Sequence, residues 1–184
     1  MSHLAQSSFQ PLRIAVLTVS DTRTLDTDTS GQTLISHLEE AGHALAARAI
    51  VIDDIYQIRA QLSQWIADAL VQVVLITGGT GLTAPDLSPR AVEPLLHERL
   101  AGGGDVFRQV SVLEIGTSSL QSRALAGFAN STLVCCMPGS PNACRTAWQK
   151  ILGEQLDSRT RPCNFVPHLK ALPERPVAAC GPRS

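Results

Sequence analysis

The sequence predicts one α/β domain, built as a three-layer α/β/α sandwich with a mostly parallel central sheet. The chain has 184 residues, 44% of them hydrophobic, which suits a single domain with a buried core. Three runs, 13–19, 73–77 and 132–137, are apolar on both faces, as in strands that helices cover on either side. Helical periods separate these runs, and this alternation indicates β-α-β units. We expect the domain to span residues 10–156.

The first half of the chain predicts alternating strands and helices. Strand 13–19 precedes a helix that ends at Gly42, and strand 46–52 precedes a helix that Asp53 and Asp54 can cap. Strand 73–77, apolar throughout, is expected at the centre of the sheet. The apolar faces of the two helices consist of Leu34, Ile35, Leu38 and Ala41, and of Ile55, Ile58, Leu62 and Ile66.

The second half predicts two more helices and a hairpin. A third helix begins at Ser88-Pro89, where a cap residue precedes a proline suited to the first helical position. Residues 116–131 are less regular, but 123–128 and 132–137 can pair as a hairpin through Asn130-Ser131. The last long helix follows Pro141-Asn142 and runs to about Leu156.

Residues 157–184 contain five prolines and no helical period, so they predict an extended proline-rich tail. We expect its first half, with Phe165 and Val166, to pack on a neighbouring subunit, and its end to be disordered.

Composition excludes several classes of partner. Fifteen basic and sixteen acidic residues give a formal charge of −1, without the broad positive field that attracts nucleic acid. No apolar stretch approaches the roughly 18–20 residues of a membrane span, and residues 1–11 lack the pattern of a secretory signal. Five cysteines without a C-x-x-C pair favour reduced thiols, with a metal site or a thiol nucleophile as the alternative. We therefore expect a cytoplasmic protein with no nucleic-acid or membrane partner.

Ligands of parallel sheets bind at the carboxyl ends of the strands, where three loops meet here: 18–31, 77–88 and 138–142. In the second loop, Gly78, Gly79 and Gly81 allow backbone N–H groups to converge on an oxyanion, and Thr77 and Thr80 add hydroxyls. This pattern predicts a phosphate-binding loop. The alternative is a tight turn that only needs positive φ angles.

Two known phosphate loops fit this segment poorly. A Walker loop needs a lysine after its last glycine, and none is present. The dinucleotide fingerprint is met loosely by Gly79-x-Gly81-x-x-Ala84, but Pro85 and Pro89 delay the helix that should begin there.

Asp86 and Asp53 are the candidate catalytic carboxylates. A carboxylate beside a bound phosphate is repulsive unless a cation lies between them, so we interpret Asp86 as a Mg²⁺ ligand or as the group that orients the attacking atom. Asp53, at the end of the second strand, can share the metal. The alternatives are a solvated turn or an accessory cap for Asp86, and a helix cap for Asp53.

The first and third loops also carry candidate anion ligands. Ser30 and Gly31 can present N–H groups of a helix N-terminus, near Ser20 and Asp21. Pro138-Gly139-Ser140 places a glycine and a hydroxyl between strand and helix. Capping and turn chemistry explain both loops equally well. The histidines lack ligand spacing and fall on predicted surfaces, whereas the tryptophans fall on core faces; they are His3, His37, His43, His97 and His168, and Trp65 and Trp148.

Taken in order, these motifs resemble the MoaB/MogA family of molybdenum cofactor biosynthesis. The resemblance covers roughly residues 10–170, and segments 115–124, 143–148 and 160–165 are most similar to its MoaB branch. The motifs are 14–21 with 28–31, LITGGTG (75–81) with Asp86, Ser88-Pro89, 121–124 and 137–141.

The resemblance implies a molybdopterin-binding fold that assembles as a trimer, or as a hexamer of two trimers in the MoaB branch. It implies adenylyl transfer, in which the phosphate of molybdopterin attacks the α-phosphate of Mg-ATP and pyrophosphate leaves. Asp86 would hold Mg²⁺, with Asp53 as its companion. Phosphate would contact Thr77, Gly78, Gly79, Thr80 and Gly81. Pterin contacts would come from Ser20, Asp21, Ser30, Gly31, Pro138, Gly139 and Ser140.

The sequence departs from the family at two positions of this loop. Pro85 precedes Asp86 where the family often has Arg-Asp, and Arg90 stands in place of a glutamate. Two hypotheses follow, a molybdopterin adenylyltransferase and a non-catalytic molybdopterin-binding accessory protein whose paralogue performs the chemistry. A nucleotide-binding dehydrogenase is opposed by Pro85 and Pro89.

Overall fold

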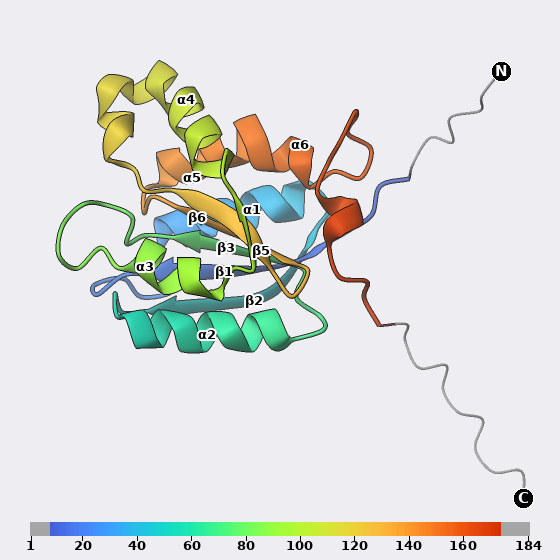
Figure 1. The fold of residues 1–184 in the computed structure, drawn as a ribbon, viewed down its shortest axis with the longest axis horizontal. Coiled ribbons are helices and arrows are strands. Elements are labelled where there is room, and N and C mark those ends of the chain that lie inside the picture. The colour runs from blue at the N-terminus through green and yellow to red at the C-terminus, as the bar shows by residue number, and fades with distance from the viewer. Residues whose placement is uncertain (1–7, 174–184) are drawn as a thin grey trace, which may run out of the picture.

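The computed structural model describes residues 8–173, which form a three-layer sandwich around a six-stranded sheet (Figure 1). The strand order is β2-β1-β3-β6-β5-β4. The first four strands in this order are parallel, and only β5 is reversed, pairing antiparallel with both β6 and β4, so the predicted mostly parallel sheet is confirmed. The strands are β1 (Arg13–Val19), β2 (Ala44–Val51), β3 (Val73–Thr77), β4 (Glu98–Leu100), β5 (Leu125–Ala129) and β6 (Thr132–Met137).

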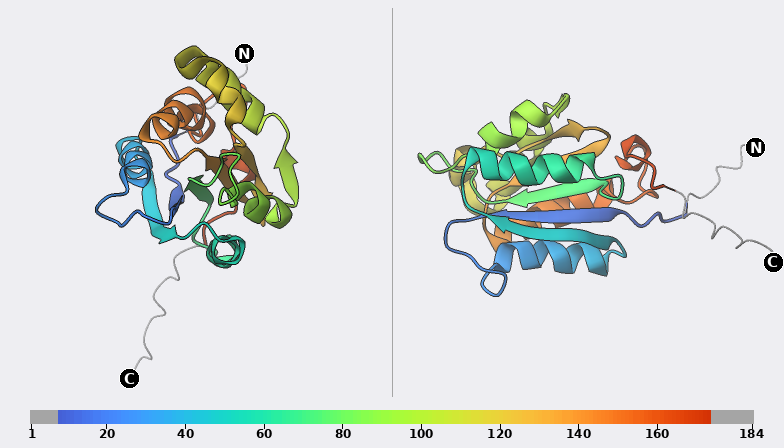
Figure 2. Two further views of the ribbon diagram at one scale, coloured as in Figure 1. Left: turned by 90° about the vertical axis from the view of Figure 1, so that its left-hand side faces the viewer. Right: turned by 90° about the horizontal axis from the view of Figure 1, so that it is seen from below.

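Helices cover both faces of the sheet. In the left panel of Figure 2, α1, α4 and α5 lie on one side of the sheet and α2 on the other. A π-helical turn, Trp148–Leu152, continues α5 into α6. The helices are α1 (Thr29–Glu40), α2 (Ile55–Ala67), α3 (Ser88–Val92), α4 (Gly103–Ile115), α5 (Pro141–Ala147) and α6 (Gly153–Gln155). Short 3-10 segments cover Glu93–Leu95, Gly116–Gln121 and Val166–His168.

The central strands are apolar on both faces because each face packs against helices. Along β1, Ile14 and Val16 contact the core under α1 and α5, whereas Ala15 and Leu17 contact the core under α2 and α3. All four side chains are fully buried. This two-sided burial is the physical cause of the continuous apolar runs.

Aspartates are the N-cap residues of the first two helices. The Asp28 carboxylate accepts the Gly31 N–H at 2.9 Å and pairs with Arg48 at 3.1 Å. Asp54 accepts the N–H groups of Tyr56 and Gln57, each at 2.9 Å. Asp54 is therefore the cap of α2, which leaves Asp53 for another role.

Strand β4 and helix α4 were not predicted, whereas α3 begins at Ser88 as predicted and only the capping role of Ser88 is wrong. Helix α3 begins with Ser88 itself, whose hydroxyl donates to the Gly78 carbonyl at 2.8 Å instead of capping the helix. Strand β5 begins at Leu125, two residues after the predicted start of the hairpin. Its turn is as predicted, because Asn130 and Ser131 both adopt positive φ angles.

The first half of the tail packs on its own chain, contrary to the expectation of a neighbouring subunit. Val166 is buried in the core under α1 and α5, and Phe165 packs against the same cluster. The Gln72 side chain donates to the Lys170 carbonyl at 2.9 Å, which fixes the segment beside the sheet. The expectation of a disordered end concerns residues 174–184, which lie outside the described residues. Among the residues described, no helix has the length and apolar character needed to cross a membrane.

His43 is buried, with 6% of its surface exposed, so its predicted surface position is wrong. Its Nδ1 accepts the Leu12 N–H at 3.1 Å, and its ring contacts Phe9 and Trp148. Burial lowers the pKa of His43 below its usual value, and the nearby Asp157 carboxylate opposes this shift. The folded chain therefore holds the imidazole neutral more strongly than the unfolded chain does.

We expect the free energy of unfolding to decrease as the pH falls below about 6.5, because the unfolded chain then binds a proton that folded His43 resists. Chemical denaturation at pH 7.5 and 5.5 measures this change. His43→Gln should reduce the difference between the two pH values, whereas His168→Gln, at an exposed position, should retain it. An equal pH dependence in the wild type and His43→Gln would contradict this role.

Candidate functional site

The three predicted loops meet at the carboxyl edge of β1, β3 and β6, at the left of Figure 1, and we call this region the loop edge. Asp53 N–H donates to Asp21 at 2.9 Å, which joins the first loop to the end of β2. Leu87 N–H donates to Asp53 at 2.9 Å, which joins the second loop to the same carboxylate. The Thr77 hydroxyl donates to the Pro138 carbonyl at 3.0 Å and joins the third loop.

Glycines allow the backbones to approach closely at this edge. Gly78 and Gly79 have φ angles of +107° and +63°, which side chains disfavour. A Cβ on Gly78 would lie 2.2 Å from the Val19 carbonyl oxygen, and one on Gly139 would lie 3.0 Å from the Gly78 Cα. The second loop is therefore packed between the first and the third.

Only some N–H and hydroxyl groups of the predicted phosphate-binding loop are free of hydrogen bonds within the described residues. Gly78 N–H donates to the Met137 carbonyl at 3.0 Å, and Gly81 N–H is directed at the Asp86 carboxylate. The Thr77 hydroxyl is buried and bonded to Pro138. Within residues 8–173, no hydrogen bond uses the N–H groups of Gly79 and Thr80. These two consecutive amides are the part of the loop that can bind an oxyanion.

Asp53 and Asp86 lie over alternate positions of this glycine loop. A Cβ on Gly79 would come within 2.8 Å of Asp53 Oδ2, and one on Gly81 within 2.7 Å of Asp86 Oδ2. Asp86 is held by Thr83, whose N–H donates to Oδ2 at 2.9 Å and whose hydroxyl donates to the same atom. Glycines at 79 and 81 thus give both carboxylates room beside the backbone.

The two carboxylates differ electrostatically. Burial raises the pKa of Asp53, and the negative charges of Asp86 and Asp21 raise it further against the Leu87 hydrogen bond. The Thr83 hydroxyl lowers the pKa of Asp86. Neighbouring negative charges repel one another, which favours a bound proton or cation between them. A positive ion would therefore relieve the repulsion between Asp53 and Asp86.

Arg123 completes the loop edge, in a role that was not predicted from the loop sequences. Its Nε donates to the Gly81 carbonyl at 2.8 Å and its guanidinium also donates to the Asp86 carbonyl, so it holds both ends of the loop. Arg123 lies two residues before β5. Because β5 is antiparallel to β6, the amino end of β5 lies at the carboxyl edge of the parallel strands. A basic residue before an antiparallel strand is the signal that could have predicted this position.

The predicted pterin ligands of the first and third loops make local contacts. The Ser20 hydroxyl accepts from Thr22 and Arg23 N–H groups at 3.3 and 3.2 Å. Ser30, beside the capped Gly31, is buried and donates to Asp28. Ser140 accepts the Ala143 N–H at 3.1 Å and caps α5. Asp21, Gly139 and Ser140 remain exposed at the edge, whereas Ser30 and Gly31 are enclosed by the Asp28 cap.

The three buried cysteines of the described residues, Cys135, Cys136 and Cys144, have the properties of structural thiols. Burial raises the pKa of Cys135 and Cys136 to about 12 and that of Cys144 to about 11. Such thiols are poor nucleophiles and poor metal ligands at neutral pH. In the described part of the chain, no group of three or more histidine, cysteine, aspartate or glutamate side chains is arranged to hold a metal ion on its own.

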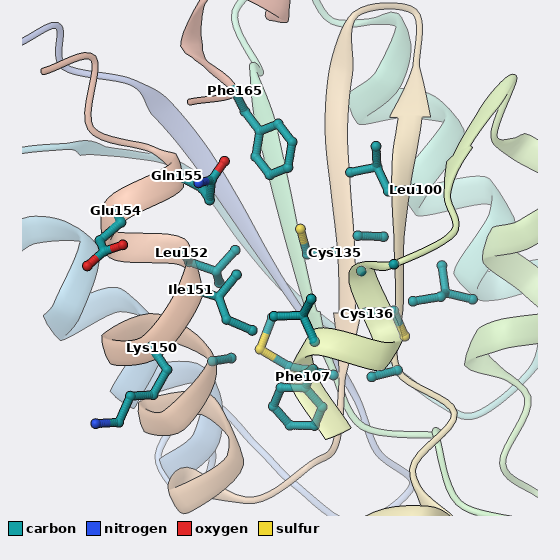
Figure 3. Close-up of a pocket in the computed structure, with 18 of the residues that line it drawn as sticks. Leu100, Phe107, Cys135, Cys136, Lys150, Ile151, Leu152, Glu154, Gln155 and Phe165 are labelled. Atoms are coloured by element: carbon teal, nitrogen blue, oxygen red, sulfur yellow. The ribbon is translucent and has the colours of Figure 1, made fainter. Parts of the chain in front are cut away.

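An apolar cavity of about 460 Å³ lies away from the loop edge, between α4 and the α5–α6 helical segment. Leu100, Phe107, Ile151 and Phe165 line it, and Lys150 directs its amine away from it (Figure 3). This lining offers few polar groups to a phosphate, so the loop edge is the candidate site for phosphate chemistry.

Comparison with known proteins identifies similar sequences over most of the chain. The model of the family described as "Probable molybdopterin binding domain" matches residues 15–158. The chain is 58% identical to Molybdenum cofactor biosynthesis protein B of Escherichia coli (strain K12) over 164 residues, which is 89% of this chain and 96% of that protein. It is 41% identical to the protein of the same name from Bacillus subtilis (strain 168), over 79% of this chain and 86% of that protein.

Solved structures show the same fold. A crystal structure of Molybdenum cofactor biosynthesis protein B superimposes with a TM-score of 0.79 and 40% identity, over 82% of this chain and 94% of that one. The tungsten cofactor synthesizing protein MoaB from Pyrococcus furiosus gives a TM-score of 0.71 and 31% identity, over 79% and 92% of the two chains.

Proposed function

The chain belongs to the family of molybdopterin-binding domains, and from this premise we propose that it binds molybdopterin and transfers AMP from Mg-ATP to the molybdopterin phosphate. The product is adenylyl-molybdopterin, and the chain then acts in the cytoplasmic biosynthesis of the molybdenum cofactor. Family membership supports the pterin ligand. The loop edge supports the chemistry.

The observation that carries the proposal is the placement of Asp53 and Asp86 beside the Gly79 and Thr80 amides. Asp53 accepts the Leu87 N–H, and both carboxylates lie over a loop whose Gly79 and Thr80 N–H groups are available to a phosphoryl oxygen. Nucleotidyl transfer depends mainly on positioning and on charge neutralisation, and this arrangement supplies both.

The donor set suits a magnesium ion that arrives with the nucleotide. Mg²⁺ is commonly held by one or two carboxylates together with substrate phosphates and waters, so a dedicated cluster of three protein ligands is not required. Asp53 and Asp86 would hold the ion, and the repulsion that raises the pKa of Asp53 would then be relieved. When bound, the ion neutralises negative charge on the phosphates.

The residues of the chain have separate roles in this proposal. Gly79 and Thr80 donate N–H groups to the phosphate that is attacked. Thr83 keeps Asp86 ionised and oriented, and Arg123 holds the loop that carries it. Ser140, Gly139 and Asp21, exposed at the same edge, contact the pterin substrate.

The second candidate is a non-catalytic molybdopterin-binding protein. The N–H groups of Gly78 and Gly81 are already hydrogen-bonded within the protein. This favours the second candidate, because the loop then offers fewer N–H donors than a triphosphate-binding loop usually provides. In that case the pterin binds at the loop edge and a paralogue performs the transfer.

An adenylyl-transfer assay distinguishes the two candidates. Purified protein is incubated with molybdopterin and Mg-ATP labelled at the α-phosphate, and labelled adenylyl-molybdopterin is measured by chromatography. Product formation supports the enzyme. Pterin binding without any product supports the accessory protein and removes the claim of catalysis.

We also propose that the chain forms a homo-oligomer, a trimer or a hexamer of two trimers. Apolar side chains remain exposed on α4 and the 3-10 segment after it, and such patches commonly mark protein interfaces. Leu113 and Leu120 are 86% and 75% exposed, and Val112 and Ile115 about half exposed.

Leu113→Glu is expected to weaken this assembly, because it places a charge at the centre of an apolar contact. Light scattering after size exclusion should give the wild type a multiple of the 19.6 kDa chain mass and give the variant a smaller mass. Gln109→Glu, at an exposed polar position of α4, is the control and should assemble like the wild type. A monomeric wild type, or a variant of unchanged mass, would refute the proposed interface.

A further inference from the structure

A polar cavity of about 390 Å³ lies next to the Asp86 loop, between α3, β4, the start of α4 and the start of β5. Its charged lining consists of four arginines and one glutamate: Arg90, Arg99, Arg108, Arg123 and Glu93. We call it the arginine cavity. Four guanidinium groups at one hollow are a strong local concentration of positive charge in a chain whose formal charge is −1.

Two of these four arginines form direct ion pairs with carboxylates. Arg99 pairs with Glu93 at 2.6 Å, and Arg108 pairs with Asp105 at 2.5 Å. Among residues 8–173, Arg90 and Arg123 form no direct ion pair with a carboxylate, and the charge of Arg123 acts on Asp53 and Asp86 at the loop edge. The cavity therefore keeps an excess of positive charge, and arginine is the side chain best suited to contact phosphate oxygens.

The amino end of α4 adds to this field. No side chain caps the helix, which begins at Gly103, and Gly104 lines the cavity. A Cβ on Gly104 would lie 2.1 Å from the Ala124 carbonyl oxygen, so glycine is needed for the helix start to lie against β5. The 13-residue helix places the positive end of its dipole beside the arginines.

Arg123 connects the cavity to the loop edge. It lines the cavity and also donates to the Gly81 and Asp86 carbonyls. Arg123 is therefore the residue that the arginine cavity and the loop edge share.

We propose that the arginine cavity binds a phosphate chain, either the β- and γ-phosphates of a nucleotide or the pyrophosphate released from it. The choice of these two ligands rests on the proposed adenylyl transfer. The binding itself rests on the charge and shape of the cavity. Arg108 and Arg123 fix the backbone through the carbonyls of Ser122 and Gly81. The anion contacts of the cavity are therefore Arg90 and Arg99, and the phosphate would share Arg99 with Glu93.

Calorimetric titration with inorganic pyrophosphate tests the proposal on the full-length chain without pterin or magnesium. The wild type should bind, and the double variant Arg90→Ala, Arg99→Ala should bind about 100-fold more weakly because two charge-assisted contacts are removed. Lys150→Ala removes a positive charge outside the arginine cavity and should bind like the wild type. Circular dichroism checks that each variant is folded.

Titrations with ATP and AMP identify the source of the phosphate chain. If the cavity takes the nucleotide tail, the double variant loses affinity for ATP and pyrophosphate but not for AMP. If it takes only the released product, the double variant loses affinity for pyrophosphate alone. Equal pyrophosphate affinity in the wild type and the double variant, or no binding by the wild type, overturns the site.

These results are independent of turnover. If pyrophosphate binding depends on Arg90 and Arg99 but the protein forms no adenylyl-molybdopterin, the anion site in the arginine cavity is supported and the proposed catalysis is contradicted. If the wild type forms the product and the double variant binds pyrophosphate as tightly as the wild type, the proposed catalysis is supported and the anion site in the arginine cavity is contradicted.

Discussion

Asp86→Asn is expected to reduce adenylyl transfer by about 100-fold or more, with little change in pterin binding. The substitution keeps the size of the side chain and its acceptor oxygen for Thr83 but removes the negative charge. If Asp86 holds the ion that accompanies the nucleotide, this charge is needed in the reaction and not in the binding of the pterin ring. The assay with α-labelled ATP measures the transfer rate.

Asp53→Asn should reduce transfer in the same direction, because Asp53 shares the ion and orients the loop through Leu87 N–H. The matched control is Asp54→Asn, at the next residue. Asparagine caps helices about as well as aspartate, so this variant should retain both stability and activity. A transfer rate that is unchanged in Asp86→Asn would exclude the metal-holding role, and an equal loss in Asp54→Asn would indicate a general effect of charge at this edge.

The sequence predicted the central sheet because burial on both faces leaves a direct signal. Strands β1, β3 and β6 need apolar side chains at nearly every position, and no surface helix produces such short continuous runs. The hairpin was predictable from Asn130-Ser131, since the turn needs two residues that tolerate positive φ.

Strand β4 and helix α4 could not be predicted for equally local reasons. The strand has three residues and its side chains are mostly exposed, so no apolar period marks it. Gly102, Gly103 and Gly104 precede or begin α4, and glycines disfavour a helix. The helix keeps exposed apolar residues as well as the buried Phe107, which blurs its amphipathic pattern.

The position of the candidate site was predictable, but the availability of its atoms was not. Parallel strands bring their following loops to one edge, which placed Asp53 and Asp86 together. Which N–H groups stay available depends on neighbours distant in sequence, such as the Met137 carbonyl that accepts the Gly78 N–H. Residue type alone does not encode these contacts. The arginine cavity could not be predicted either, because β4 and α4, which form two of its walls, were not predicted.

The second large effect is expected for Gly78→Ala, which should destabilise the fold and close the loop edge. A side chain here must adopt a φ of +107° and place its Cβ 2.2 Å from the Val19 carbonyl oxygen. Backbone strain and overpacking each cost roughly 1–3 kcal/mol, so the free energy of unfolding should fall by about 4 kcal/mol. Chemical denaturation measures this loss.

Gly102→Ala is the matched control, because a Cβ at that position meets no atom within 4 Å and its φ of −77° suits alanine. Its free energy of unfolding should stay within about 1 kcal/mol of the wild type. If Gly78→Ala were equally harmless, the backbone at Gly78 could move away from Val19. The close packing that places Gly79 and Thr80 beside Asp53 would then not be fixed by the glycine. A large loss confined to Gly78→Ala would instead show that the position of the loop, and so the geometry proposed for phosphate binding, depends on the absence of one Cβ atom.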